Sequence, residues 1–161
     1  MTLMSIQNAL RHMLVHRFHA AVLVTAVVIT HVPASASKLP DTIPGPIRAK
    51  IIRVIDGDTV VVRAHIWLGQ EIETTVRLFG IDAPELRGRC LAESDLALKA
   101  RDFLADLLAS GDILLRDIRF GKYAKRVVAR MEAADGRDCA SALIGIGLGR
   151  AYGGGKRRSW C

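Results

Sequence analysis

Carboxylates and an arginine gather in two short stretches of this 161-residue sequence. Asp56 and Asp58 flank a glycine at the start of a β-rich run, and Asp82 and Glu85 belong to a proline-containing loop segment, Asp-Ala-Pro-Glu. Arg77 precedes that segment and keeps its charge at any physiological pH. If the stretches meet, four carboxylates share a small volume, which is unfavourable unless protons or a cation neutralise them. Oxygen ligands favour a hard divalent ion, Ca²⁺ or Mg²⁺.

Each of these pieces also has a purely structural interpretation. Asp-Gly is a common turn dipeptide, Asp-Ala-Pro-Glu is a plausible entry to a helix, and an arginine on a strand usually faces solvent. Asp56-Gly57-Asp58 runs directly into a strand and lacks the spaced ligands of an EF-hand. Only the joint occurrence of the pieces favours chemistry over structure.

Short strands and two helices must position these residues. Hydrophobic periodicity predicts strands over 47–55, 59–67, 71–81, 112–120 and 125–132, and helices over 92–109 and 139–146. This order indicates an α+β domain, namely a five-stranded Greek-key barrel with one helix between its third and fourth strands and a short C-terminal helix. A turn at 68–70 joins two of the strands, so the two acidic stretches are expected at one end of the sheet.

The first 36 residues read as a targeting segment. They contain no Asp or Glu, and an apolar run over 20–29 is followed by Ala34-Ser35-Ala36, which is typical of a secretory signal peptide cleaved after Ala36. An uncleaved anchor is the alternative, but the run falls short of the roughly 20 residues that span a bilayer. Met4 and Met13 are alternative starts. We therefore expect a secreted or periplasmic protein with no stable membrane association after cleavage.

The rest of the chain divides into three parts. Residues 37–46 carry three prolines and are expected to form an extended, poorly ordered arm, residues 47–152 the folded domain, and residues 153–161 a basic tail. Residues 37–161 have a formal net charge of +5, which suits a polyanionic partner such as nucleic acid. We expect a monomer.

Three cysteines remain in the exported chain, so at least one is unpaired within it. Cys139 opens an apolar helical stretch and is expected to be a buried thiol. Cys90 lies in a polar loop soon after Glu85, and Cys161 ends a glycine-rich tail that can reach it. A Cys90–Cys161 disulfide is therefore predicted, which would fasten the tail over the barrel.

Three blocks resemble the signature blocks of the staphylococcal nuclease (thermonuclease) family. They are V-I-D-G-D-T-V (54–60), R-L-F-G-I-D-A-P-E (77–85) and G-K-Y-A-K-R-V-V-A-R (121–130). Their order and spacing match the family over residues 47–152. The resemblance implies an OB-fold barrel and Ca²⁺-dependent hydrolysis of DNA and RNA.

The resemblance also implies a set of calcium ligands. Asp58 and Asp82 would be the side-chain ligands, and the backbone carbonyl of Ala83 would be the third protein ligand. Asp56 would act through water. Ala83 stands where the family commonly has threonine, which removes a hydroxyl but keeps the carbonyl.

The same resemblance implies catalytic and substrate-binding roles. Arg77 and Arg126 would bind the phosphate, and Glu85 would orient or deprotonate the attacking water. Lys122 and Tyr123 would line the substrate pocket. These roles agree with the chemistry, because a phosphodiester anion resists attack unless positive charge surrounds its oxygens and a water is aligned.

Besides Ala83, the chain departs from the family pattern in two further places. The stretch from Lys122 to Arg126 is one residue longer, so Lys125 and Arg126 compete for the second phosphate contact. Because adjacent strand residues face opposite sides, only one of the two can point into the site. The planar guanidinium of Arg126 fits a phosphate better than the ammonium of Lys125 does, so Arg126 is predicted. The residues after Tyr152 do not match the family's long C-terminal helix.

Two functions follow from these observations. The first is an exported, calcium-dependent nuclease with low sequence specificity, and the second is a non-catalytic OB-fold module that binds oligonucleotide or envelope polysaccharide. Arg77 together with Glu85 favours the nuclease, because binding alone has no use for a carboxylate beside a phosphate. His65 is the only histidine after residue 36, which argues against a serine triad and against a zinc site.

Overall fold

The computed structural model describes residues 40–123 and 125–161, and the predicted signal peptide over 1–36 lies outside the described residues. The described strands are β1 (Thr42–Ile43), β2 (Ile47–Asp56), β3 (Thr59–Trp67), β4 (Gln70–Leu78), β5 (Ile81–Asp82), β6 (Asp112–Phe120), β7 (Arg126–Ala133) and β8 (Arg150–Ala151). The described helices are α2 (Leu91–Leu107) and α3 (Cys139–Gly145). No helix in these ranges combines the length and the apolar character needed to cross a membrane.

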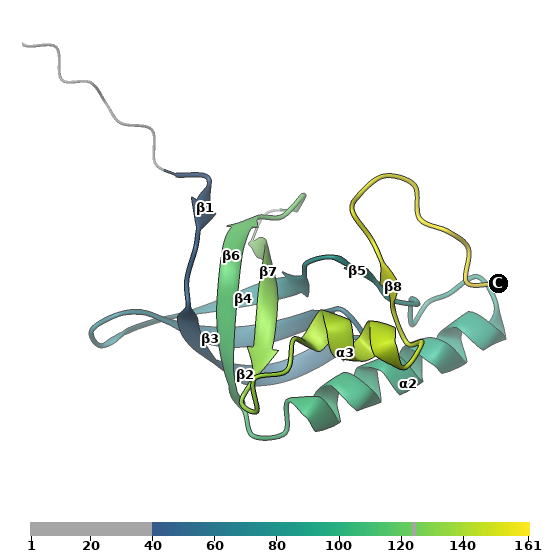
Figure 1. Cartoon of the computed structure of the whole chain (residues 1–161), viewed down its shortest axis with the longest axis horizontal. Coiled ribbons are helices and arrows are strands. Elements are labelled where there is room, and N and C mark those ends of the chain that lie inside the picture. The colour runs from purple at the N-terminus through teal and green to yellow at the C-terminus, as the bar shows by residue number, and fades with distance from the viewer. Residues whose placement is uncertain (1–39, 124) are drawn as a thin grey trace, which may run out of the picture. The chain divides into compact units, whose positions relative to one another are not determined.

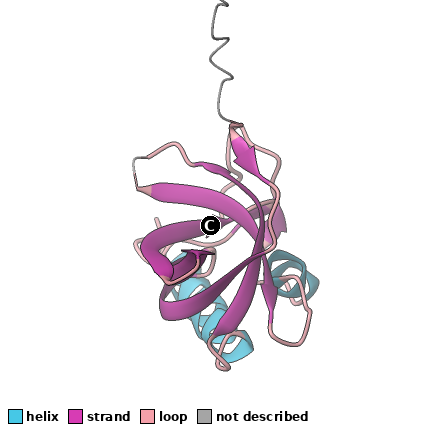
Figure 2. Cartoon of the chain, turned by 90° about the vertical axis from the view of Figure 1, so that its left-hand side faces the viewer, coloured by secondary structure: helices cyan, strands magenta, loops and turns pink. Residues whose placement is uncertain are grey.

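Five of these strands close into a barrel, as Figures 1 and 2 show. β2, β3 and β4 follow one another as antiparallel neighbours, and β6 returns to pair with β2. β7 closes the barrel, because it pairs with β6 in the antiparallel sense and with β4 in the parallel sense. With α2 between the third and fourth barrel strands, this is the predicted α+β OB-type fold, which is confirmed.

The core lies between the inner face of the barrel and the two helices. Alternate residues of β3, namely Val60, Val62 and Ala64, belong to the core, and Thr59 and Val61 on the opposite face of the strand are buried as well. The buried face of α2 follows helical spacing and includes Ala100 and Leu104. Figure 1 shows α2 and α3 lying next to one another beside the barrel.

The predicted strand over 71–81 is in fact two strands. β4 ends at Leu78, and Gly80 follows with a φ of +82°, a left-handed conformation that favours glycine. The chain then turns into β5, which pairs with β8 in a second, two-stranded sheet. This break redirects the second acidic stretch away from the barrel wall.

The predicted arm over 37–46 is partly ordered, which corrects the sequence interpretation. Thr42 and Ile43 form β1, which pairs with Arg119 and Ile118 of β6. Three prolines prevent a long strand here, but they allow a short edge strand. Residues 37–39 lie outside the described part.

Candidate active site

The first acidic stretch is the tight turn between β2 and β3. Asp56 Oδ1 accepts a hydrogen bond from the backbone N–H of Asp58 at 3.0 Å, which holds the turn. A Cβ atom at Gly57 would lie 2.7 Å from Cβ of Ala100 in α2 and 3.1 Å from Cβ of Ala83. Only glycine therefore allows the turn to pack against both the helix and the second acidic stretch.

Strand register brings two arginines to this turn. β3 and β4 pair Thr59 with Arg77, and the backbone N–H of Leu78 donates to the carbonyl oxygen of Asp58 at 2.7 Å. The parallel register of β4 and β7 pairs Thr75 with Arg126. Since Thr75 and Arg77 are two residues apart on one strand, Arg77 and Arg126 lie on the same face of the sheet.

The second acidic stretch follows β5 and is held by a glutamate. Glu93, buried in the first turn of α2, accepts hydrogen bonds from the backbone N–H groups of Arg89 at 2.8 Å and Glu85 at 3.4 Å. A Cβ atom at Gly88 would lie 2.6 Å from Cγ of Glu93, so the loop can wrap this carboxylate only with glycine there. The role of Glu93 was not predicted, although an acid in the first turn of a helix was visible in the sequence.

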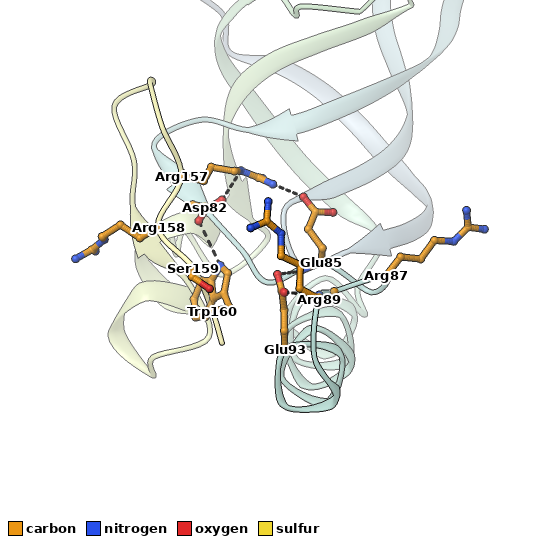
Figure 3. Close-up of a pocket in the computed structure, with 10 residues that line it drawn as sticks. Asp82, Glu85, Arg87, Arg89, Glu93, Arg157, Arg158, Ser159 and Trp160 are labelled. Carbon is orange, nitrogen blue, oxygen red and sulfur yellow. Dashed lines mark hydrogen bonds and ion pairs between the residues drawn. The ribbon is translucent and has the colours of Figure 1, made fainter.

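The three carboxylates of Asp58, Asp82 and Glu85 meet around one guanidinium, that of Arg157. Figure 3 shows two of them, Asp82 and Glu85, beside Arg157. Arg157 Nε lies 2.6 Å from Asp82 Oδ1, Nη2 lies 3.8 Å from Asp58 Oδ2, and Nη1 binds Glu85 Oε1. The side chains of Asp58 and Asp82 are 3% and 5% exposed, whereas that of Glu85 is half-exposed. The two acidic stretches thus come together, as the sequence predicted.

Burial and neighbouring charges have opposite effects on the pKa values of Asp58 and Arg157. Burial raises the pKa of Asp58 to about 6, although Arg77 Nη1 lies 2.5 Å from its Oδ1 and opposes the rise. Burial lowers the pKa of Arg157, but its hydrogen bond to Glu85 and the negative charge of Asp82 raise it on balance. Arg157 is therefore a fully charged cation among the carboxylates.

A cleft of about 510 Å³ opens beside the carboxylates. It is lined by Asp56, Thr59, Arg77, Glu85, Lys122, Tyr123, Arg126, Val128, Tyr152 and Arg157. The structure therefore brings the five residues with predicted catalytic or substrate-binding roles to one cleft. Asp58 does not line the cleft itself, but it accepts a hydrogen bond from Arg77, which does.

Arg126 is the more informative of the two adjacent basic residues. Its Nε is buried and has no hydrogen-bond acceptor among the described residues, and its guanidinium lies 4.7 Å from the ring centre of Tyr123. Lys125 is exposed and has a φ of 62°, so it belongs to the turn before β7 and not to the strand. The prediction that Lys125 and Arg126 are adjacent residues of one strand was therefore wrong. Arg126 is nevertheless the one of the two that lines the cleft.

The C-terminal tail folds back over the second acidic stretch. Cys161 forms a disulfide with Cys90, the pairing favoured by the sequence, while Cys139 is a free, buried thiol. Trp160 Nε1 donates to Asp82 Oδ2 at 3.3 Å, and its ring centre lies 3.7 Å from Cζ of Arg150. The sequence predicted a basic tail over 153–161, but it did not predict the contact of that tail with the carboxylates.

The described residues also contain a group of potential soft-metal ligands at the disulfide. Ligand atoms of Cys90, Glu93 and Cys161 all lie within 4.8 Å of one another. Because the two sulfurs are bonded to each other, they are not available as thiolates. This group therefore holds the loop and the tail together.

Comparison with known protein families gives a match. A search of curated proteins found none that matches, whereas the family model for staphylococcal nuclease homologues matches residues 75–159, more than half of the chain. The matched range includes Arg77, Glu85, Arg126 and the tail as far as Ser159, and it begins after the first acidic turn. Together with the closed five-stranded barrel, this match shows that the chain belongs to the staphylococcal nuclease homologue family and has a nuclease-like fold.

Proposed function

We propose that this protein is an exported, calcium-dependent nuclease that hydrolyses phosphodiester bonds of DNA and RNA with low sequence specificity. The observation that carries the proposal is a cleft in which Arg77, Arg126 and Glu85 converge, and in which a buried donor of Arg126 lacks an acceptor among the described residues. A buried donor without a partner is costly, and a phosphate oxygen is the acceptor that would satisfy it.

The two arginines are suited to bind the phosphate. A guanidinium carries five N–H donors in a fixed fork, so Arg77 retains donors for a phosphate beside its bond to Asp58. Arg126, packed on Tyr123, approaches from β7 on the same face. Two fixed positive charges at one phosphodiester stabilise the extra negative charge of the transition state.

Glu85 is suited to handle the attacking water. Its backbone is held by Glu93, and its carboxylate lines the cleft with half of its side chain exposed. A carboxylate in this position accepts a hydrogen bond from water and orients it toward the phosphorus atom. A module that only binds nucleic acid gains nothing from this negative charge.

The residues around Arg157 fit a hard cation. Three carboxylates already enclose a positive group, and the buried Asp82 Oδ1 is neutralised by its ion pair with Arg157 at 2.6 Å. The side chains of Asp58 and Asp82 with the carbonyl of Ala83 would hold Ca²⁺, and Asp56 would act through water. Bound there, the ion would offset the charge that develops on the phosphoryl oxygens.

The proposal places the protein outside the cytoplasm, secreted or in a periplasm, as a monomer without stable membrane association. The support is the apolar run over 20–29 with a small-residue site after it, and the Cys90–Cys161 disulfide, which persists in oxidising compartments. Fractionation of a culture that expresses the full chain, with N-terminal sequencing of the product, tests it. A new N-terminus at Ser37 is expected.

The direct test of function is cleavage of plasmid DNA and of RNA by the purified protein, with Ca²⁺ or with excess chelator. Cleavage of both substrates that requires Ca²⁺ and is lost in E85Q is expected. Undiminished cleavage in chelator would contradict the calcium assignment. Binding of oligonucleotide without cleavage would support the non-catalytic module instead.

A further inference from the structure

The tail supplies the cation that the carboxylates now hold. Among the described residues, every ion pair of Asp82 and of Glu85 is with Arg157, and the same guanidinium approaches Asp58. Of the three carboxylates, Arg77 forms an ion pair with that of Asp58. Arg157 thus occupies the space between the three carboxylates that a metal ion would need.

This arrangement is built into the tail. Two residues beyond Arg157, the Ser159 carbonyl accepts a hydrogen bond from Arg150 Nη1 at 2.9 Å. Trp160 is stacked on Arg150 and bonded to Asp82, and Cys161 is bonded to Cys90. Figure 3 shows Arg157 directed to Asp82 and Glu85, while the neighbouring Arg158 points away from the pocket.

We propose that Arg157 is a resident cation of the Asp58–Asp82–Glu85 site and that a divalent ion must displace it, so that the tail sets the affinity of the site for metal. The inference rests on the cation site of the proposed function. A metal ion and the Arg157 guanidinium at these oxygens weaken each other, because like charges repel and both need the same lone pairs.

The disulfide makes this competition intramolecular. A displaced guanidinium stays within a few residues of Cys161, so its effective concentration at the carboxylates remains high. Free arginine in solution would compete poorly in comparison. Removing the charge of Arg157 and breaking the Cys90–Cys161 disulfide should therefore both raise the affinity of the site for metal.

The test is calorimetric titration of Ca²⁺ into the purified protein, expressed for export so that its disulfide forms. R157Q is compared with wild type, and R158Q is the matched control, because it removes the same charge from the adjacent position. We expect R157Q to bind Ca²⁺ about 10-fold more tightly or better, a typical size for coupling between two ligands, and R158Q to resemble wild type. C161S should also bind more tightly than wild type, because its tail is untethered.

A second measurement uses Tb³⁺ as the probe and light absorbed by tryptophan to excite it. Trp160 is bonded to Asp82, whereas Trp67 is exposed on β3, so W160F should lose the sensitised emission and W67F should keep it. A Tb³⁺ affinity that rises in R157Q supports the proposal independently of any nuclease activity.

Several results would overturn the inference. Equal Ca²⁺ affinity in R157Q and wild type, with calcium-dependent cleavage intact, would refute the competition and leave the proposed function standing. Unchanged Ca²⁺ affinity with a large loss of kcat at saturating Ca²⁺ would show that Arg157 acts on the substrate instead. Absence of Ca²⁺ and Tb³⁺ binding in every variant would refute both the inference and the calcium site.

Discussion

Arg126 and Lys125 are neighbours in the chain with opposite surroundings. Arg126 lines the cleft, and its buried Nε has no acceptor within residues 40–123 and 125–161, while Lys125 is exposed in a turn. R126A should therefore lower kcat/KM by about 10²–10³-fold, as expected for loss of a charge-assisted contact to the transition state. K125A, the matched control, should stay near wild type in the same plasmid and RNA assays. A larger loss in K125A would reverse the assignment.

Glu85 and Arg77 are both expected to act in catalysis, but they differ in how much the stability of the fold depends on them. E85Q should lower kcat by about 10²–10⁴-fold without loss of stability, because Glu85 is half-exposed and its backbone contacts remain. R77A should also lose activity, but it leaves Asp58 buried without its closest cation, at a cost of about 3–5 kcal/mol. Urea unfolding beside the kinetics separates the two effects. Near-normal kcat in E85Q would favour the binding module.

Cys139 is expected to be inert in the folded protein. Burial, with the nearby charges of Asp138 and Asp135, raises the pKa of its thiol to about 12, from an ordinary value of 9.0. The folded state thus holds this proton more tightly than the unfolded state, so the contribution of Cys139 to stability falls only as pH rises above 9. Alkylation by iodoacetamide at pH 8 should require denaturant, as read by mass spectrometry. Rapid labelling of the native protein would show that the thiol is accessible.

Residues in local motifs were predictable, whereas the partner of the carboxylates was not. The stretches 54–60 and 77–85 encode a turn and a loop, and their joint occurrence in the sequence singled out Asp58, Asp82 and Glu85. Arg157 is separated from Glu85 by 72 positions. The glycine-rich tail has no hydrophobic periodicity from which the path of the backbone could be predicted. The disulfide was the available signal, since a tether at Cys161 confines the preceding arginines to the vicinity of Cys90.

At the scale of elements, the site depends on the contact between the β2–β3 turn and α2. G57A should destabilise the fold by about 1–3 kcal/mol, because its Cβ would meet Ala100 and Ala83, which cannot move without moving the backbone. It should also lower activity by shifting Asp58. G145A is the control, since a Cβ there meets nothing within 4 Å. Thermal unfolding of both variants checks this, and an unchanged midpoint in G57A would contradict it.

The elements that the sequence did not predict are the shortest ones. The barrel strands and both helices have enough residues to show a period, so their existence and order followed from the pattern. β1, β5 and β8 have two residues each and exist only because a partner strand accepts their hydrogen bonds. β5 and β8 nevertheless place Asp82 beside Arg150, and thereby position the base of the tail.

For the molecule as a whole, the disulfide is expected to be a main source of stability. It links residues 71 positions apart, and the chain-entropy model assigns a loop of this size about 4 kcal/mol. The double variant C90S/C161S should therefore unfold at a lower urea concentration, with its barrel intact by circular dichroism. C139S is the control for loss of a thiol. A double variant as stable as wild type would show that the tail contacts suffice without the covalent link.

Closure of the barrel by β7 also has a consequence for the order of folding. The pairings of β2 with β6 and of β4 with β7 join residues distant in sequence, such as Ile47 with Leu115 and Thr75 with Arg126. Such non-local contacts slow folding, typically to milliseconds or longer, because loop entropy is lost before they form. Until β7 docks, the edges of both β4 and β6 have unpaired backbone groups. The docking of β7 therefore covers two exposed strand edges, those of β4 and β6, in one step, and it removes both as sites of intermolecular pairing.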